Sequence, residues 1–322
     1  MVDLEDIRAA REVVYGALGR TPLLRSTTLG ERAGVDAYLK AENLQRTGSF
    51  KTRGATVRVS HLNAAERARG LVAVSAGNHA QAVAYAASAA GVRATVVMPE
   101  TAPRAKVEAS RGYGAEVVLH GTVYDAFDKA DELSRERGLV YVHPFDDPHI
   151  IAGQGSVGLE ILEDLPDVDA IVVCVGGGGL IAGIATAVKS LRPGTRVIGV
   201  EPTGAACVAA GLRQGSAHFL DAVTTIADGL ATPTSGDLVL EHLRAYVDDM
   251  VLVDDEEIVE GMRFLLQRAK LLAEPAGAAA VAAVLAGKVD LPPGGRVAVT
   301  VSGGNIDLGR LSQYLEHGPP DA

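Results

Sequence analysis

Large aromatic rings are scarce in this sequence, which contains no tryptophan and only 4% phenylalanine and tyrosine. Its core must therefore be built mainly from small aliphatic side chains. The two cysteines, Cys174 and Cys207, are too few for a disulfide framework, which excludes the small disulfide-rich secreted domains. No uninterrupted apolar run is long enough to span a bilayer, and the first residues lack a signal-peptide pattern. We therefore expect a cytoplasmic protein without a membrane partner.

Clusters of basic residues are also absent. The 30 lysines and arginines are outnumbered by 40 acidic residues, which gives a net charge of −10 and makes nucleic acid an unexpected partner. A small anion remains a compatible ligand, because backbone N–H groups at helix ends bind anions whatever the net charge. The 322 residues are 48% hydrophobic and 22% charged, which indicates a globular protein of about two domains.

Short β-branched runs alternate with alanine-rich segments along most of the chain, which predicts an α/β fold with parallel sheets covered on both faces. The first series should contain strands at 71–74, 94–98, 116–119 and 139–142, with helices at 78–90, about 103–111 and 123–137. The second series should contain strands at 170–175, 196–200 and 297–301, with helices at 150–162, 180–191, near 207, 237–243, 256–272 and 276–285. The first series could form a small domain of its own.

Lys51 lies just after a short apolar run, in the segment Ser49-Phe50-Lys51. We expect Ser49 to cap a helix that begins at Phe50, which would place the Lys51 amine in the first helical turn. The positive end of the helix dipole disfavours an ammonium there, so the amine stays neutral more easily. A neutral amine is what imine formation with an aldehyde cofactor requires. The alternative is an ordinary surface lysine.

Four consecutive glycines follow a strand-like run and open a helix at Leu180. Unpaired N–H groups in such a loop bind phosphate, and glycines let the anion approach closely. A flexible linker is one alternative. A dinucleotide-binding fold is another, because Gly177-x-Gly179-x-x-Ala182 and the later Glu201 fit its fingerprint and would make the protein an NAD-dependent oxidoreductase. That fold, however, places the loop after the first strand of its domain.

Two further motifs come at predicted strand ends, Ser75-Ala76-Gly77-Asn78-His79 and Ser302-Gly303-Gly304-Asn305. Ligands of parallel sheets bind at the carboxyl ends of the strands. The hydroxyl, carboxamide and backbone donors of the first motif suit a carboxylate and a ring hydroxyl. For the first motif, the alternative is an ordinary capped turn with His79 buried or solvated. For the second motif, it is a tight turn without a ligand.

The order and spacing of these motifs resemble the fold-type II pyridoxal-phosphate enzymes, most closely the threonine/serine dehydratase family that also contains serine racemase. The resemblance covers roughly residues 21–307 and also rests on Ile151-Ala152-Gly153-Gln154-Gly155 and Glu274-Pro275-Ala276-Gly277. It implies a tryptophan synthase β-like α/β fold of two open, mainly parallel twisted sheets, with pyridoxal 5′-phosphate in the interdomain cleft. The large domain would comprise 1–70 and 148–322, and 71–147 would form a small, mobile, substrate-clamping domain. A homodimer or homotetramer is implied.

The resemblance also implies a role for each matching residue. Lys51 would be the catalytic residue, forming the Schiff base with the cofactor and taking the α-proton. The other cofactor-binding residues would be Gly176, Gly177, Gly178, Gly179 and Leu180 at the phosphate, Asn78 at the ring oxygen and Ser302 at the pyridine nitrogen. The carboxylate of an amino acid substrate would be held by Ser75, Gly77 and His79.

The implied reaction is β-elimination, which converts L-threonine and/or L-serine to 2-oxobutanoate or pyruvate and ammonia. A serine hydroxyl at position 302 cannot hold a proton on the pyridine as a carboxylate would, which favours elimination over transamination. Ala76 stands where the similar racemases have a second serine, so we expect little racemisation. The alternatives are a lyase for another β-hydroxy amino acid (3-hydroxyaspartate or phenylserine), a serine racemase, an NAD-dependent oxidoreductase and a non-catalytic binding protein.

Some members of the family bind magnesium through an acid at the position of Glu201, a carbonyl at that of Ala205 and a second acid at that of Cys207. A thiol is a poor ligand for a hard cation. We therefore expect no metal site in this chain.

Overall fold

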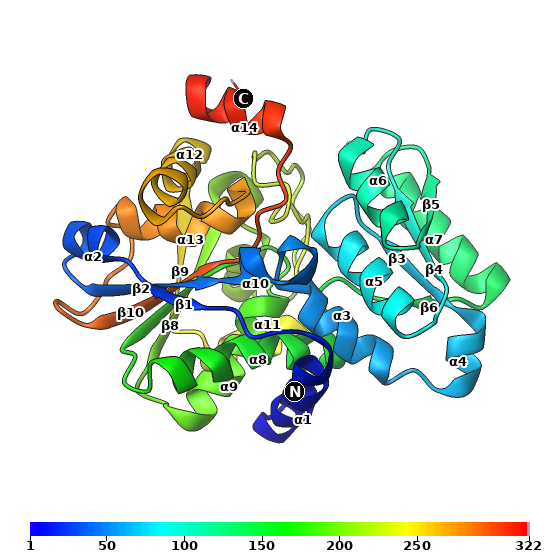
Figure 1. The fold of residues 1–322 in the computed structure, drawn as a ribbon, viewed down its shortest axis with the longest axis horizontal. Coiled ribbons are helices and arrows are strands. Elements are labelled where there is room, and N and C mark those ends of the chain that lie inside the picture. Colours follow the sequence, from blue (N-terminus) through cyan, green and yellow to red (C-terminus); the bar gives the residue numbers. More distant parts are fainter. Residues whose placement is uncertain (103, 321–322) are drawn as a thin grey trace.

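Two separate β-sheets organise the molecule, seen here in a computed structural model that describes residues 1–102 and 104–320. The strand order is β1-β2-β10-β7-β8-β9 in the six-stranded sheet and β5-β4-β3-β6 in the four-stranded sheet. Strand β1 runs antiparallel to β2, and the other described strand pairs are parallel. The sheets lie in separate lobes (Figure 1). The predicted α/β fold with two mainly parallel sheets is confirmed.

The larger lobe holds the six-stranded sheet. Its strands are β1 (Leu23–Arg25), β2 (Asp36–Ala41), β7 (Ala170–Cys174), β8 (Arg196–Pro202), β9 (Asp249–Val253) and β10 (Arg296–Val301). Its helices are α1 (Leu4–Ala17), α2 (Thr27–Ala33), α3 (Lys51–Ser60), α8 (Pro148–Asp164), α9 (Gly179–Leu191), α10 (Cys207–Gln214), α11 (Asp237–Tyr246), α12 (Asp255–Phe264), α13 (Pro275–Leu285) and α14 (Leu308–His317). Short helical turns are η1 (Glu42–Leu44), η2 (Arg46–Gly48), η3 (Thr203–Ala205) and the π-turn η4 (Leu265–Ala269).

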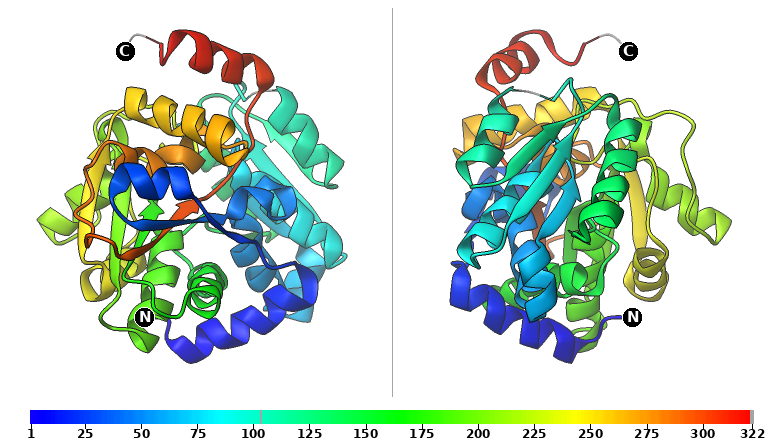
Figure 2. Two further views of the ribbon diagram at one scale, coloured as in Figure 1. Left: turned by 60° about the vertical axis from the view of Figure 1, so that its left-hand side comes forward. Right: turned by 90° about the vertical axis from the view of Figure 1, so that its right-hand side faces the viewer.

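The smaller lobe holds β3 (Leu71–Val74), β4 (Ala94–Met98), β5 (Glu116–Leu119) and β6 (Val140–Tyr141). Its helices are α4 (Ala64–Arg69), α5 (Asn78–Ala89), α6 (Arg104–Gly112) and α7 (Val123–Arg137). Helix α5 packs on one face of the sheet and α7 on the other, as the second view of Figure 2 shows. The predicted start of α6 at Pro103 lies outside the described residues.

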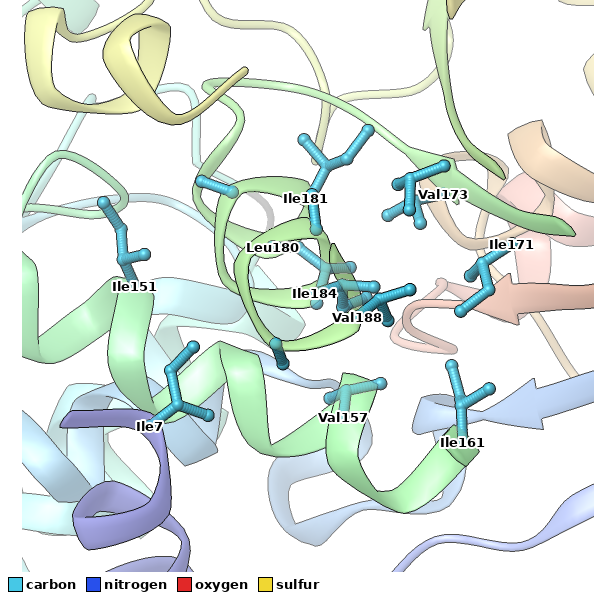
Figure 3. Close-up of a cluster of buried hydrophobic side chains, with 14 of the residues drawn as sticks. Ile7, Ile151, Val157, Ile161, Ile171, Val173, Leu180, Ile181, Ile184 and Val188 are labelled. Carbon is cyan, nitrogen blue, oxygen red and sulfur yellow. The ribbon is translucent and has the colours of Figure 1, made fainter. Parts of the chain in front are cut away.

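The larger sheet is buried on both faces. Helices α8 and α9 cover one face, where their aliphatic side chains meet those of β7 and of α1 (Figure 3). Helix α13 lies across the other face, with α12 packed on it. Seven of its eleven residues, PAGAAAVAAVL, are alanine or glycine, so it can approach the strands closely. This placement satisfies the expectation that small side chains build the core.

Glycines bring three helices of the larger lobe into close contact. A Cβ atom on Gly153 of α8 would lie 2.6 Å from the Cα of Gly54 in α3. A Cβ on Gly183 of α9 would overlap the carbonyl oxygen of Ile151 in α8. Larger residues would therefore force these helices apart. The contact fixes α3 against the centre of the lobe.

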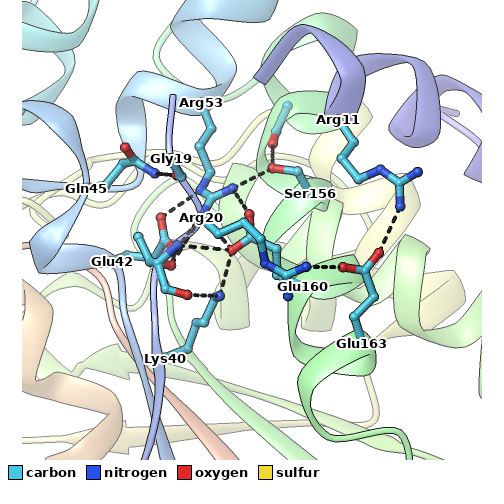
Figure 4. Close-up of polar contacts among 12 residues, drawn as sticks. Arg11, Gly19, Arg20, Lys40, Glu42, Gln45, Arg53, Ser156, Glu160 and Glu163 are labelled. Atoms are coloured by element: carbon cyan, nitrogen blue, oxygen red, sulfur yellow. Dashed lines mark hydrogen bonds and ion pairs between the residues drawn. The ribbon is translucent and has the colours of Figure 1, made fainter. Parts of the chain in front are cut away.

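A buried ion network also holds α3 in place (Figure 4). The Arg53 guanidinium donates to the carboxylates of Glu42 and Glu160, and Lys40 donates to Glu160 at 2.6 Å. All four side chains are fully buried, and their charges balance. Removing one partner would leave an unpaired buried charge, which costs about 3–5 kcal/mol. The network therefore fixes α3 relative to β2 and α8.

Three local expectations differ from the structure. Ser49 does not cap α3, which begins at Lys51 after Phe50 without a side-chain cap. Ser49 instead forms a β-bridge with Gly303, and its hydroxyl has no hydrogen-bond partner among the described residues. The helix expected at 256–272 ends earlier, in a π-turn closed by Lys270 in a left-handed conformation. Strands β1 and β9, at the two edges of the large sheet, were not predicted. No helix among the described residues combines the length and apolarity needed to cross a membrane.

Candidate active site

The larger sheet brings two of the predicted motifs together. Strands β7 and β10 are parallel neighbours, so the segments that follow them begin at the same edge. The tetraglycine loop follows β7, and Ser302 follows β10. Ser302 accepts a backbone hydrogen bond at 3.1 Å from Phe50, the residue before Lys51. Lys51, Ser302 and the glycine loop therefore meet at one end of the sheet.

Lys51 is the first residue of α3, and its Nζ donates to the carbonyl oxygen of Pro144 at 2.8 Å. Burial lowers the pKa of this amine to about 8. The positive end of the helix acts in the same direction. A substantial fraction of the amine is therefore neutral and nucleophilic near physiological pH.

The segment 142–146, which leads from the smaller lobe back to the larger one, contacts several site elements. Its Val142 carbonyl accepts from Nε2 of His79 at 2.9 Å, and its Pro144 carbonyl accepts from Lys51. The Phe145 ring lies where a Cβ on Gly177 would be. This crossing segment thus links α5, α3 and the glycine loop.

The glycine loop presents free backbone donors. Within the described part of the chain, the N–H groups of residues 176–180 donate to neither backbone nor side-chain acceptors. Gly178 has φ +88°, a conformation that favours glycine, and precedes the first turn of α9. Gly176 lies against Leu230, where a Cβ would come within 3.0 Å of its Cα. The loop therefore offers the helix N-terminus and several amides to an anion.

Asn78 is held in one orientation from both sides. Its Oδ1 accepts from Nδ2 of Asn305 at 2.8 Å, and its own Nδ2 donates to Glu274. Burial raises the pKa of Glu274 to about 8, and the nearby Asp228 charge adds to this, so the carboxyl is largely protonated at neutral pH. The second hydrogen of the Asn78 amide remains available for a ligand.

The three predicted carboxylate-binding residues lie at the start of α5. The Ser75 hydroxyl accepts from the N–H of Gly77 at 3.0 Å. His79 is buried, and burial, with a smaller contribution from the Lys51 charge, lowers its pKa to about 3. Its neutral ring donates to Val142, so the side chain is engaged in the protein. What His79 offers a ligand is its backbone N–H, which lies in the first turn and has no partner within the helix.

Glu201 is placed differently from a ribose-binding acid. Its two carboxylate oxygens accept from the N–H groups of Val208 and Ala209, both at 2.8 Å, and its side chain is fully buried. The neighbouring Cys207 remains a thiol, because burial raises its pKa to about 11. A thiol is a poor ligand for a hard divalent cation, and both Glu201 oxygens are already engaged by backbone N–H groups. Across residues 1–102 and 104–320, no three or more His, Cys, Asp or Glu side chains gather as metal ligands.

Sequence patterns did not indicate the contacts between the lobes. Lys106 of α6 forms an ion pair with Asp228 of the larger lobe, and the Asn78–Glu274 hydrogen bond crosses at the same side. A cavity of about 160 Å³ lies between them, lined by residues of both lobes that include Gln81. Neither these contacts nor the crossing segment has a local sequence signature, since the partners are far apart in the chain.

These features define an enzyme site for a phosphorylated aldehyde. The buried Lys51 amine suits the aldehyde, and the unpaired N–H groups suit the phosphate. The Ser49 hydroxyl, beside Gly303, is also buried without a partner among the described residues. The chemistry of this donor set fits pyridoxal phosphate.

The sequence matches the family described as pyridoxal-phosphate dependent enzyme over residues 14–303, and the chain belongs to this family. It is 49% identical to the L-threonine ammonia-lyase of Thermotoga maritima, over 99% of this chain and 79% of that one. The processed threonine deaminase isoform 2 from Solanum lycopersicum superposes with a TM-score of 0.93 at 40% identity, covering 97% of this chain and 86% of the other. Maize serine racemase superposes with a TM-score of 0.93 at 36% identity, covering 98% and 97%. The alternative of an NAD-dependent oxidoreductase is therefore wrong.

Proposed function

We propose that this enzyme is a threonine/serine ammonia-lyase, which converts L-threonine and/or L-serine to 2-oxobutanoate or pyruvate and ammonia by β-elimination. The observation that carries the proposal is the buried amine of Lys51, with a pKa of about 8, beside a glycine loop with free N–H groups. The relatives named threonine ammonia-lyase and threonine deaminase support the choice of substrate.

The cofactor would be held by residues from both lobes. Lys51 would bond to its aldehyde, and residues Gly176 to Leu180 would donate N–H groups to its phosphate. The free amide hydrogen of Asn78 would donate to the ring oxygen, and the Ser302 hydroxyl would face the pyridine nitrogen. When bound, pyridoxal phosphate withdraws electrons from the α-carbon of the substrate.

The remaining chemistry belongs to side chains and backbone groups of this chain. A substrate carboxylate would accept from the N–H groups at the start of α5, in the segment from Ser75 through Gly77 to His79. Lys51, neutral when displaced from the aldehyde, would take the proton from the α-carbon and return a proton later. The Ser302 hydroxyl is uncharged, so it does not keep a proton on the pyridine nitrogen. This favours loss of a β-hydroxyl over transamination.

We propose further that residues 71–147 form a small domain that closes on the larger domain of 1–70 and 148–322. The contacts that support this are the hydrogen bond between Asn78 and Glu274 and the ion pair between Lys106 and Asp228, which both join the lobes. Closure would exclude water from the amine of Lys51. We also propose a cytoplasmic location and a homodimer or homotetramer. Light scattering of the purified protein measures the oligomeric state.

A substrate panel tests the reaction. The purified enzyme with pyridoxal phosphate should release a 2-oxo acid from L-threonine or L-serine faster than from 3-hydroxyaspartate or phenylserine. Lys51→Ala should reduce the rate by several orders of magnitude while the protein remains folded. Release of oxo acid from neither L-threonine nor L-serine would contradict the proposal.

Serine racemase is the second candidate, favoured by the similarity to the maize enzyme. Ala76 lies between Ser75 and Gly77 and has no proton to donate to the second face of the α-carbon. The wild type should therefore convert L-serine to D-serine far more slowly than to pyruvate, and Ala76→Ser should raise the racemisation rate. Rapid racemisation by the wild type would favour the racemase instead.

A further inference from the structure

A buried thiol contacts the glycine loop from helix α10. Cys207 is fully buried, and its Sγ donates to the carbonyl oxygen of Gly176 at 3.8 Å. The same sulfur lies 3.5 Å from Oγ1 of Thr232. The first residue of the loop is therefore held through its carbonyl, while its N–H stays free.

The position of Cys207 depends on Glu201. Ala206, the residue before α10, provides no side-chain cap. Glu201, at the end of β8, takes over this function from another element, because its two oxygens accept from Val208 and Ala209 in the first turn. A carboxylate is favourable at this positive end of a helix. Glu201 thus fixes where α10 begins relative to the sheet.

Helix α10 also lies near a second glycine of the loop. A Cβ on Gly178 would come within 3.6 Å of Cγ2 of Val208, the residue next to Cys207, and within 2.5 Å of Cγ1 of Val239 in α11. Helices α10 and α11 therefore leave little room beside Gly178. A glycine loop loses much conformational entropy when it becomes ordered. Packing that orders the loop before binding therefore reduces the entropy lost when an anion binds, which strengthens binding.

We propose that Glu201 and Cys207 are positioning residues that hold the glycine loop in its phosphate-binding conformation without a metal ion. The proposal rests on the phosphate-binding role proposed above for this loop. The carboxylate oxygens of Glu201 accept from two backbone N–H groups, and the sulfur of Cys207 contacts the Gly176 carbonyl and Thr232, so the pair acts through hydrogen bonds.

Comparing two cofactor forms tests the proposal, because pyridoxal has the aldehyde and ring of pyridoxal phosphate but lacks the phosphate. Dissociation constants of both are measured by absorbance titration of the cofactor-free protein. Glu201→Gln places an amide N–H against a helix N–H and should weaken pyridoxal phosphate binding roughly tenfold. Cys207→Ala should weaken it roughly threefold, and Cys207→Ser, which keeps a donor, should restore it. Pyridoxal binding should be unchanged in all three.

Thr195→Ala is the matched control, because Thr195 also donates from a buried side chain to a backbone carbonyl, that of Val168. It lies before β8, at the end of the strand opposite Glu201. Its two dissociation constants should match those of the wild type. The ³¹P resonance of the bound cofactor should shift in Glu201→Gln and Cys207→Ala but not in Thr195→Ala.

The outcomes separate this proposal from the function on which it rests. Equal weakening of both cofactor forms, or no weakening of either, would overturn the positioning role. Loss of binding after treatment of the wild type with a chelator would overturn the claim of metal independence. If the wild type bound pyridoxal as tightly as pyridoxal phosphate, the phosphate-binding role of the loop itself would be wrong. Should Cys207→Ala fail to fold, Glu201→Gln gives the same comparison.

Discussion

Replacing Glu274 by glutamine should change how the stability of the cofactor-free protein depends on pH. Glu274 is 2% exposed, and burial raises the pKa of its carboxyl from 4.5 to about 8. Glutamine resembles the protonated carboxyl in shape, and its oxygen can still accept from Nδ2 of Asn78. The variant should therefore keep the fold and lose only the titration.

The direction and size follow from proton linkage. Above pH 4.5 the unfolded chain releases this proton, while the folded protein keeps it up to about pH 8. Folding is therefore coupled to proton uptake, and the stability falls as pH rises through this window. One pKa unit corresponds to about 1.4 kcal/mol, so Glu274 should lower the stability of the wild type by roughly 3 kcal/mol between about pH 5.5 and pH 8.

Urea denaturation at these two pH values, with wild type and variant side by side, measures the effect. Other groups titrate in both proteins, so the difference between the two pH dependences isolates Glu274. We expect the variant to gain roughly 3 kcal/mol relative to the wild type on going from about pH 5.5 to pH 8. Parallel pH dependences would show that Glu274 is ionised in the folded protein and refute the reasoning.

Three further predictions concern packing, the lobes and the reactive amine. Gly183→Ala should destabilise the protein by about 1–3 kcal/mol in urea, because the new methyl group overlaps backbone atoms of α8. Gly16→Ala, whose new methyl group would have no atom within 4 Å, should be neutral or stabilise by up to ~1 kcal/mol. Equal effects of the two substitutions would contradict this. Lys106→Met and Asp228→Asn should each raise KM, because the ion pair joins the lobes. A double-mutant cycle should give a coupling of about 0.5–1 kcal/mol, since the pair is partly exposed. Additive effects would exclude the pair as a lobe contact. The rate at which the cofactor bonds to the cofactor-free protein should rise with pH with a midpoint near pH 8, where half of the Lys51 amine is neutral, and level off above it. A midpoint at the ordinary lysine value of 10.5 would show an unperturbed amine.

Local pattern and topology were enough to predict part of the site. The tetraglycine run and Ser302 follow strands that the β-branched runs made visible, and parallel strands bring their carboxyl ends to one edge. Lys51 was expected in the first turn of a helix, and it is the first residue of α3, while its proposed role came from the resemblance of the combined motifs. In each case the sequence signal that predicts the feature lies within about ten residues of it.

Tertiary contacts determined what the sequence did not show. Ser49 would cap a helix by local rules, but it pairs with Gly303, and its hydroxyl has no hydrogen-bond partner among the described residues. Asn78 is oriented by Asn305 and Glu274, which lie about 200 residues away. Strand β9 lies beside β8 at the edge of the sheet, and although Met250 to Val253 form an apolar run, only Val253 among its five residues is buried.

Borohydride reduction of the enzyme loaded with pyridoxal phosphate, followed by peptide mass spectrometry, tests the central claim most directly. The cofactor mass should appear on the peptide that contains Lys51, and the Lys51→Ala protein should carry none. A cofactor mass fixed to any other lysine, or a covalently labelled Lys51→Ala protein, would contradict the account.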